Sequence, residues 1–177
     1  MFKIVSPASG LGFRFGGTKT MKKLLQTVDS FGPTILRLVL GGVMLMHGLQ
    51  KTTGNFGGQG FEGTMKMFTE TMKIPYALAM AAIVTESVGS ACLILGFLTR
   101  IWAIGMGILI SVAAYKVHLA NGFFMNWMGN QKGEGFEYHI LVLGMSLALL
   151  FLGGGKASID AGLSGPKKEP KSDKFKA

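Results

Sequence analysis

The sequence predicts an all-α integral membrane protein. Four transmembrane helices would form a bundle, with a short interfacial amphipathic helix between helices 1 and 2. Hydrophobic residues make up 49% of the 177 residues and charged residues only 15%, a composition too apolar for an ordinary soluble domain. Four apolar segments each approach the roughly 20 residues that cross a bilayer, although the fourth is somewhat short. The net charge of +9 comes from basic residues at the segment ends, which favours anionic lipid headgroups as partners over nucleic acid.

The chain divides into three parts by composition. Residues 1–30 are basic and lack a long apolar run, so we expect an uncleaved cytoplasmic segment, because a secretory signal needs an apolar core. The sequence Met21-Lys22-Lys23 resembles a natural start, which makes residues 1–20 a loose extension. Residues 31–163 form the membrane domain. Residues 164–177 are rich in lysine and contain two prolines, which predicts a disordered basic cytoplasmic tail.

The first helix is expected over about 33–51. Pro33 suits its first turn, because the missing N–H has no helical partner there in any case. His47 and Lys51 lie four residues apart and share a helix face, and Gly48 beside them lets another backbone or a ligand come close. Polar side chains in such a helix must face other helices or a wet cavity. We therefore expect the bundle to be organised around this face.

A short amphipathic helix follows the glycine-rich loop at residues 52–60. Phe61, Met65, Phe68 and Met72 recur at helical spacing, which predicts a helix lying at the membrane interface. This helix would either act as a lid over the bundle or simply cap the outer ends of the helices, and the sequence leaves both alternatives open.

The other three helices are expected over about 75–97, 101–119 and 137–153. Pro75 opens the second helix, a short turn leads into the third, and a polar, glycine-rich loop leads into the fourth. Basic residues are concentrated in the N-terminal segment, the turn at Arg100 and the tail. The positive-inside rule therefore places both termini in the cytoplasm and both long loops outside.

Glu86, near the middle of the second helix, is the strongest candidate site residue. A carboxylate at that depth costs about 2.5–3.5 kcal/mol and needs a partner or a proton. It could bind the polar head of a ligand or relay a proton with His47 or Lys51, or it could be half of a structural pair between helices 1 and 2. Imidazole titrates near neutral pH, so His47 could carry protons or hydrogen-bond a quinone carbonyl, or it could simply join two helices.

Two polar residues near the outer ends of helices 3 and 4, His118 and Glu137, complete the candidate set. We expect His118 and Glu137 to line the same outward-facing mouth as His47 and Lys51. His139 stands two residues from Glu137 and so points to a different helix face. This spacing is not that of a helical metal motif, and no metal site is predicted.

Charged residues at the cytoplasmic side are assigned to structure or to the interface. Anchoring to lipid phosphate is the favoured interpretation for Arg37 and Arg100, and Asp160 could pair with either one. No haem, flavin or nicotinamide motif is present, and the single cysteine, Cys92, lies in an apolar segment. Electrons for any redox reaction would therefore come from a partner or a bound cofactor, for which a quinone is the candidate.

A series of short motifs resembles the DoxX family of small bacterial membrane proteins. In chain order they are Leu36-Arg37-Leu38 with Gly41, His47-Gly48-x-x-Lys51, Phe56-Gly57, Glu86 with Gly89, Leu95-Gly96-Phe97-Leu98-Thr99-Arg100, Glu137-Tyr138 and Gly155-Lys156-x-Ser158-x-Asp160. The series covers about residues 33–163. The family's usual Gly-Pro-Gly is Gly153-Gly154-Gly155 here, and an aromatic residue is replaced by Ala157, so we expect the last segment only to cap the bundle.

The resemblance implies a four-helix protein of the bacterial cytoplasmic (inner) membrane. Some DoxX-like proteins are linked to oxidoreductase complexes, and the related DoxD subunit belongs to a thiosulfate:quinone oxidoreductase. Three functions follow as alternatives. One is a membrane subunit of an oxidoreductase system, with a polar pocket for a quinone-like or other small ligand and a soluble redox partner protein. The second is a small transporter, which would have to form a homo-oligomer. The third is a scaffold or assembly subunit whose buried charges are structural.

Overall fold

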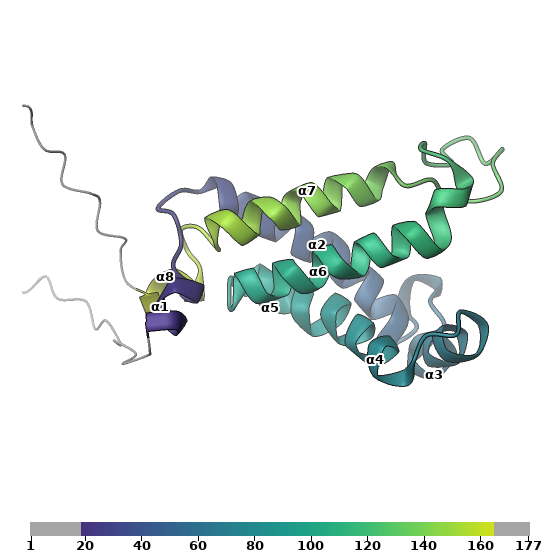
Figure 1. Cartoon of the computed structure of the whole chain (residues 1–177), viewed down its shortest axis with the longest axis horizontal. Helices are drawn as coiled ribbons and strands as arrows, with labels where there is room; N and C mark the ends of the chain where they lie inside the picture. Colours follow the sequence, from purple (N-terminus) through teal and green to yellow (C-terminus); the bar gives the residue numbers. More distant parts are fainter. Residues whose placement is uncertain (1–18, 165–177) are drawn as a thin grey trace, which may run out of the picture.

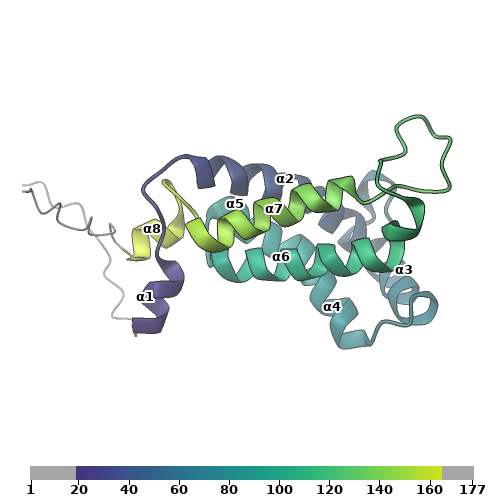
Figure 2. The same cartoon turned by 45° about the horizontal axis from the view of Figure 1, so that its top comes forward.

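The computed structural model describes residues 19–164, and this part of the chain is helical and contains no strand. The expected loose extension before residue 19 and the basic tail after Ser164 lie outside the described residues. Figure 1 and Figure 2 show the long helices packed side by side along the longest axis of the molecule. The fold class that the sequence predicts, an all-α membrane bundle, is confirmed.

Three helices in the described part are long and apolar enough to cross a membrane: α2 (Gly32–Thr52), the helix Tyr76–Leu95 and the helix Thr99–Asn121. The fourth, α7 (Glu137–Leu152), is apolar but has only 16 residues. Its rise of about 24 Å is somewhat less than the ~30 Å hydrocarbon core. All four helices begin and end within two residues of the expected positions.

Two of the long helices contain a π-helical turn, in which the backbone hydrogen bond spans one extra residue. The second helix consists of α4 (Tyr76–Val84), the π-turn η3 (Thr85–Gly89) and α5 (Ser90–Leu95). The third consists of α6 (Thr99–Ala113), the π-turn η4 (Ala114–His118) and the short 3-10 helix η5 (Leu119–Asn121). Each π-turn carries a candidate site residue, Glu86 in η3 and His118 in η4.

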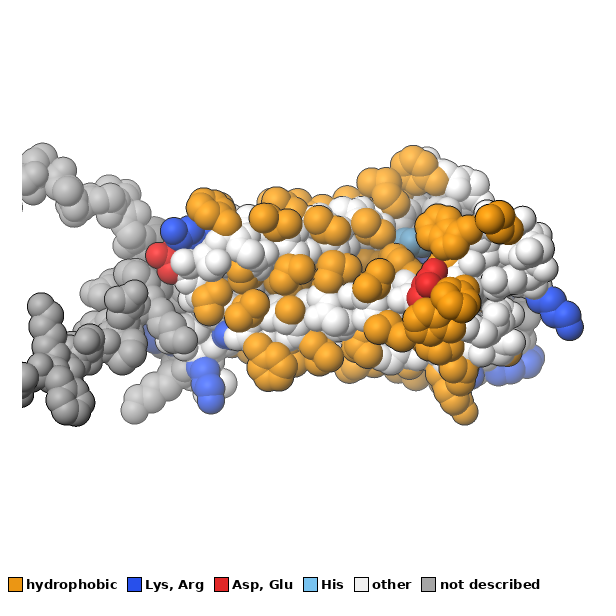
Figure 3. Space-filling model, turned by 90° about the horizontal axis from the view of Figure 1, so that it is seen from above, with side chains coloured by type: hydrophobic (Ala, Val, Ile, Leu, Met, Phe, Trp, Pro, Cys, Tyr) orange, Lys and Arg blue, Asp and Glu red, His pale blue; other side chains and the backbone are white. Residues whose placement is uncertain are grey.

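The core lies where the four helices meet. It is formed by buried apolar side chains: Leu40, Met44, Leu93, Ala103, Met106, Ile110, Val142 and Leu149. Large apolar side chains on the outer faces, such as Ile108 and Phe151, are exposed, as expected of a surface that contacts lipid. Figure 3 shows hydrophobic side chains over the middle of one face and charged side chains toward its two ends.

The two ends of the bundle carry different elements. At one end, which we call the terminal end, the short helices α1 (Lys19–Leu25) and α8 (Ile159–Ser164) lie together. At the other, the loop end, lie the 3-10 helix η1 (Asn55–Gly57), the helix α3 (Gly60–Lys66), its π-helical continuation η2 (Met67–Thr71) and the loop 122–136.

The amphipathic helix expected between the first two spans is present as α3 and η2. Met65 is buried against Ala79 and Ile83 of α4, and Phe68 packs on the same cluster. This helix therefore belongs to the folded bundle at the loop end. Its place at a membrane interface stays a prediction.

Arg37 is buried near the terminal end, with 3% of its surface exposed. Its guanidinium donates to the carbonyls of Leu93 and Ile94 at the end of α5, and to those of Gly154 and Ala157 after α7. The last carbonyls of a helix lack intrahelical partners, and a cation there also complements the helix dipole. The expectation that Arg37 reaches out to lipid phosphate is therefore wrong.

Arg100 joins two further helix ends. It donates to the carbonyls of Leu150 and Phe151 in the last turn of α7, and to those of Lys23 and Leu24 in α1. Its Nε–O distance to Leu150 is 2.8 Å. Arg100 therefore caps α7 and attaches α1 to it. These contacts take the place of the lipid phosphate contact that we expected.

Asp160 caps the start of α6. Its two carboxylate oxygens accept the N–H groups of Leu98 and Thr99 at 2.8 and 2.9 Å, and an acidic group at a helix N-terminus is stabilised by the dipole. The pairing that we considered between Asp160 and an arginine is thus replaced by helix capping. Gly96 permits the close approach of this segment: a Cβ there would lie 2.4 Å from Cβ of Ser158.

Candidate functional site

An ion pair between the first two spans forms the centre of the candidate site. The Nζ atom of Lys51, in the last turn of α2, lies 2.5 Å from Oε2 of Glu86 in η3. The Glu86 side chain is 9% exposed and the Lys51 side chain 21% exposed. Two opposite charges with so little water around them neutralise each other across the helix interface, and the partial exposure of Lys51 leaves the pair within reach of a small ligand.

Backbone geometry on both helices brings this pair together. A Cβ added to Gly48 would lie 2.5 Å from the carbonyl oxygen of Glu86, so only glycine lets α2 approach η3 this closely. Glu86 itself stands in a π-helical turn, a feature that recurs at functional sites. The expectation that Gly48 admits another backbone is confirmed.

His47 extends the polar centre toward the fourth helix. It is half-buried, one turn before Lys51 on α2. Its ring centroid lies 6.2 Å from that of Tyr138 on α7. The hydroxyl of Tyr138 donates to Sδ of Met44 at 3.3 Å, which holds the phenol ring against α2.

Two more histidines lie beside Tyr138. His139 is buried, and its ring centroid is 4.1 Å from that of His118 and 5.6 Å from that of Tyr138. His118 must carry its proton on Nδ1, because this atom lies 2.9 Å from the carbonyl oxygen of Glu134, which can only accept. The rings of His118 in η4, His139 and Tyr138 in α7, and His47 in α2 therefore form a line of neighbouring rings that leads from η4 across α7 to the ion pair between α2 and η3.

Glu137 does not join this group. Its Oε1 accepts the backbone N–H of Met125 at 3.0 Å and the indole N–H of Trp127 at 3.3 Å. The carboxylate therefore holds the loop that follows η5, and the shared mouth that we expected for Glu137 and His47 is not formed by these contacts.

The structure thus brings three predicted residues together, namely His47, Lys51 and Glu86. His118 joins them only through His139, which the sequence analysis had set aside because it points to a different helix face from Glu137. The two residues do lie on different faces of α7, since His139 is buried against His118 of η4 and Glu137 binds the loop. The available sequence signal is the spacing of seven residues between His139 and Ser146, which places two polar side chains on one face of a largely apolar helix, and the structure buries both.

The arrangement can exchange protons and hydrogen bonds. Lys51 and the imidazole of His47 can donate to a carbonyl oxygen, and Glu86 can accept from a hydroxyl group. Within residues 19–164, no three histidine, cysteine or carboxylate side chains are grouped so that they could hold a metal ion.

Comparisons with known proteins agree with these features. The family model described as DoxX matches residues 32–119, which include Lys51, Glu86 and His118 and end before α7. A protein of Bacillus subtilis (strain 168) named "Putative oxidoreductase CatD" is 30% identical over 118 residues, which cover 67% of this chain and 78% of that protein. No solved structure matches the chain. A multi-pass helical bundle with this sequence similarity identifies the chain as a member of the DoxX family.

Proposed function

We propose that this protein is a membrane subunit of an oxidoreductase system, and that its polar centre of His47, Lys51 and Glu86 binds the head of a quinone-like ligand and moves protons to or from it. The observation that carries the proposal is the Lys51–Glu86 ion pair beside His47, placed between membrane helices. Ionisable residues within membrane spans mark ligand or proton pathways more often than not. The name of the Bacillus relative adds support for redox chemistry.

The proposal includes a location and a partner. The excess of basic residues at the terminal end favours the bacterial inner membrane with both termini in the cytoplasm. Redox chemistry at the polar centre would require electrons from a soluble partner protein, since no redox-cofactor motif is present in the sequence.

The test is extraction into nanodiscs made from native membranes, followed by mass spectrometry of the bound lipids and co-purifying proteins. We expect a quinone and a redox enzyme in stoichiometric amounts. The amounts of both that co-purify should be smaller for the variants His47→Ala and Glu86→Gln. The variant Lys66→Met, which changes an exposed cation on α3, is the matched control. Folded variants that retain quinone, partner and quinone-linked activity at the level of the unchanged protein would contradict the proposal.

A scaffold role is the second candidate, because the same ion pair also ties α2 to the second span at their closest approach. The two roles differ in what a double replacement does. A scaffold tolerates Lys51→Met combined with Glu86→Leu, since an apolar pair of similar size packs as well, whereas a ligand site loses its ligand.

A further inference from the structure

A groove runs along the outer surface between α6 and α7. It consists of two adjoining cavities of about 420 and 280 Å³ that share Ser111 and Leu143. Apart from a few small polar residues the walls are apolar, and exposed side chains such as Ile108 and Ile140 form its rim. Because both helices belong to the membrane-spanning bundle, whatever fills this groove must come from the bilayer.

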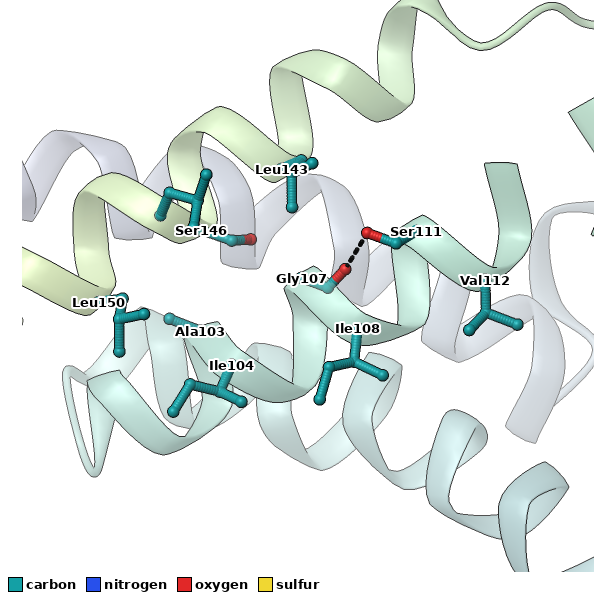
Figure 4. A pocket seen from close by; sticks show the side chains of 10 residues that line it. Ala103, Ile104, Gly107, Ile108, Ser111, Val112, Leu143, Ser146 and Leu150 are labelled. Atoms are coloured by element: carbon teal, nitrogen blue, oxygen red, sulfur yellow. Dashed lines mark hydrogen bonds between the residues drawn. The ribbon is translucent and has the colours of Figure 1, made fainter. Parts of the chain in front are cut away.

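Figure 4 shows how the larger cavity is built. Ile104, Ile108 and Val112 follow one another along α6, while Leu143 and Ser146 come from α7. Gly107 leaves the space open in the middle: a Cβ there would make ordinary contacts of 3.6 Å with Leu143 and 3.7 Å with Ser146. Alanine would fit at this position without strain, so the groove stays hollow here because residue 107 is a glycine.

Two buried polar atoms at the groove have no hydrogen-bond partner. They are Oγ of Ser146 and Nδ1 of His139, and the two residues, 2% and 6% exposed, are among those that line the larger and the smaller cavity. Buried polar atoms are almost always paired. In the interior of a bilayer no water supplies the missing partner, so a ligand with a polar group is the natural one.

The groove leads to the polar centre. His139 lines its loop end, and the same residue stands in the line of rings that continues through Tyr138 to His47. A ligand head held at His139 is therefore one aromatic ring away from the histidine next to the ion pair.

We propose that this groove binds an amphiphile with one long apolar chain, which lies along α6 and α7 and presents a hydrogen-bonding head to His139. This inference rests on the proposed function and assigns its ligand a place. From Ala103 to Leu119 the lining residues of the third span, which lie in α6, η4 and η5, extend about 24 Å, more than half of a ~30 Å hydrocarbon core. A narrow apolar channel with a few placed polar groups fits an isoprenoid or acyl chain.

The experiment labels the groove directly. The full-length protein in nanodiscs of phosphatidylcholine and phosphatidylglycerol is irradiated with one of two photoreactive probes, an azido-quinone with a decyl chain or a phosphatidylglycerol with a diazirine near the chain end. Labelled peptides are identified by mass spectrometry. Gly107→Leu fills the groove, Gly107→Ala fills it partly without strain, and Gly144→Leu is the control, because Gly144 lies on α7 with open space around it.

We expect the azido-quinone to label the head end of the groove, between residues 110 and 119 and between 136 and 143. This labelling should fall about tenfold in Gly107→Leu, which corresponds to ~1.4 kcal/mol of binding free energy. It should fall less in Gly107→Ala and not at all in Gly144→Leu. Labelling by the quinone alone identifies a quinone-type ligand, whereas labelling by the phospholipid alone, which carries two acyl chains, contradicts a ligand with one chain.

Three further results would overturn the inference. They are even labelling of all lipid-facing helices, labelling that is indifferent to Gly107→Leu, and cross-linked dimers joined through this groove in place of lipid adducts. Labelling does not depend on turnover, so it also separates the two proposals. A groove that labels as expected while His47 and Glu86 variants keep full activity removes the redox role alone.

Discussion

At the scale of single residues, the terminal end depends on charges whose partners lie far away in the sequence. Arg37 is separated from Gly154 by 117 residues and from Leu93 by 56. An apolar run with an arginine predicts a snorkelling side chain just as well as a buried one, and only the tertiary fold decides between them. For this reason Arg37, Arg100 and Asp160 could be predicted from the sequence as structural charges, whereas their hydrogen-bond partners could not.

Replacement of Arg37 by lysine should destabilise the protein. A lysine ammonium cannot reach four carbonyls that the planar guanidinium contacts together, and buried carbonyls left without donors cost about 1–3 kcal/mol each. We expect a loss of about 2 kcal/mol or more in the free energy of unfolding, measured by denaturant titration in mixed micelles. Lys66→Met serves as the exposed control, and an equal effect of both changes would refute the assignment.

Gly96→Ala should be similarly harmful. Gly96 has φ = 66°, and an added Cβ would lie 2.4 Å from Cβ of Ser158. The left-handed conformation costs a non-glycine residue roughly 1–2 kcal/mol, and the clash adds to this. We expect a lower thermal midpoint than for Gly42→Ala, where nothing lies within 4 Å. Similar midpoints for the two variants would mean that the turn adapts without cost.

At the scale of elements, the positions of the long helices could be predicted and their interruptions could not. Runs of about twenty apolar residues leave the backbone few alternatives in a bilayer. The π-turn η3 is accompanied by close packing: at Gly89, the ring of Trp102 comes within 2.6 Å of the place a Cβ would occupy. Neither hydrophobic period nor turn residues encode such a contact, and the seven-residue helix α1 is likewise too short to predict from pattern.

The Lys51–Glu86 ion pair between α2 and η3 should show energetic coupling between its two charges. Removing one partner, by Lys51→Met or Glu86→Leu, leaves the other buried. We expect each to lower the free energy of unfolding by about 1–3 kcal/mol, less than the ~3–5 kcal/mol of fully buried pairs because Lys51 keeps some contact with solvent. The double variant should recover most of this loss. Strictly additive losses in a double-mutant cycle would show that the pair contributes no coupling.

At the scale of the whole molecule, the orientation of the bundle is the prediction with the broadest consequences. It decides whether the polar centre, which lies toward the loop end, receives its ligand and its protons from the outer or the inner side. The argument rests on the distribution of lysine and arginine across the connecting segments, a rule that acts during insertion and leaves no trace in side-chain contacts.

Single cysteines introduced into a Cys92→Ala background would test the orientation in bacterial cells. Asn130 in the long loop and Thr20 in α1 are both exposed. We expect Asn130→Cys to react with a membrane-impermeant maleimide in intact cells, and Thr20→Cys to react only after permeabilisation. The reverse pattern would place the termini outside and the polar centre on the cytoplasmic side.

The four carbonyls around Arg37 also bear on how the protein is made. The ribosome synthesises Gly154 and Ala157 long after the first span, 117 and 120 residues later, which at ~5–20 residues per second is roughly 6–24 s. During that interval the nascent first helix carries a guanidinium that lacks two of its four final partners. We expect stalled chains that end before residue 150 to be cleaved by membrane-bound quality-control proteases much faster than chains that extend past residue 164. Biogenesis would then be complete only when the last turn closes on the first helix.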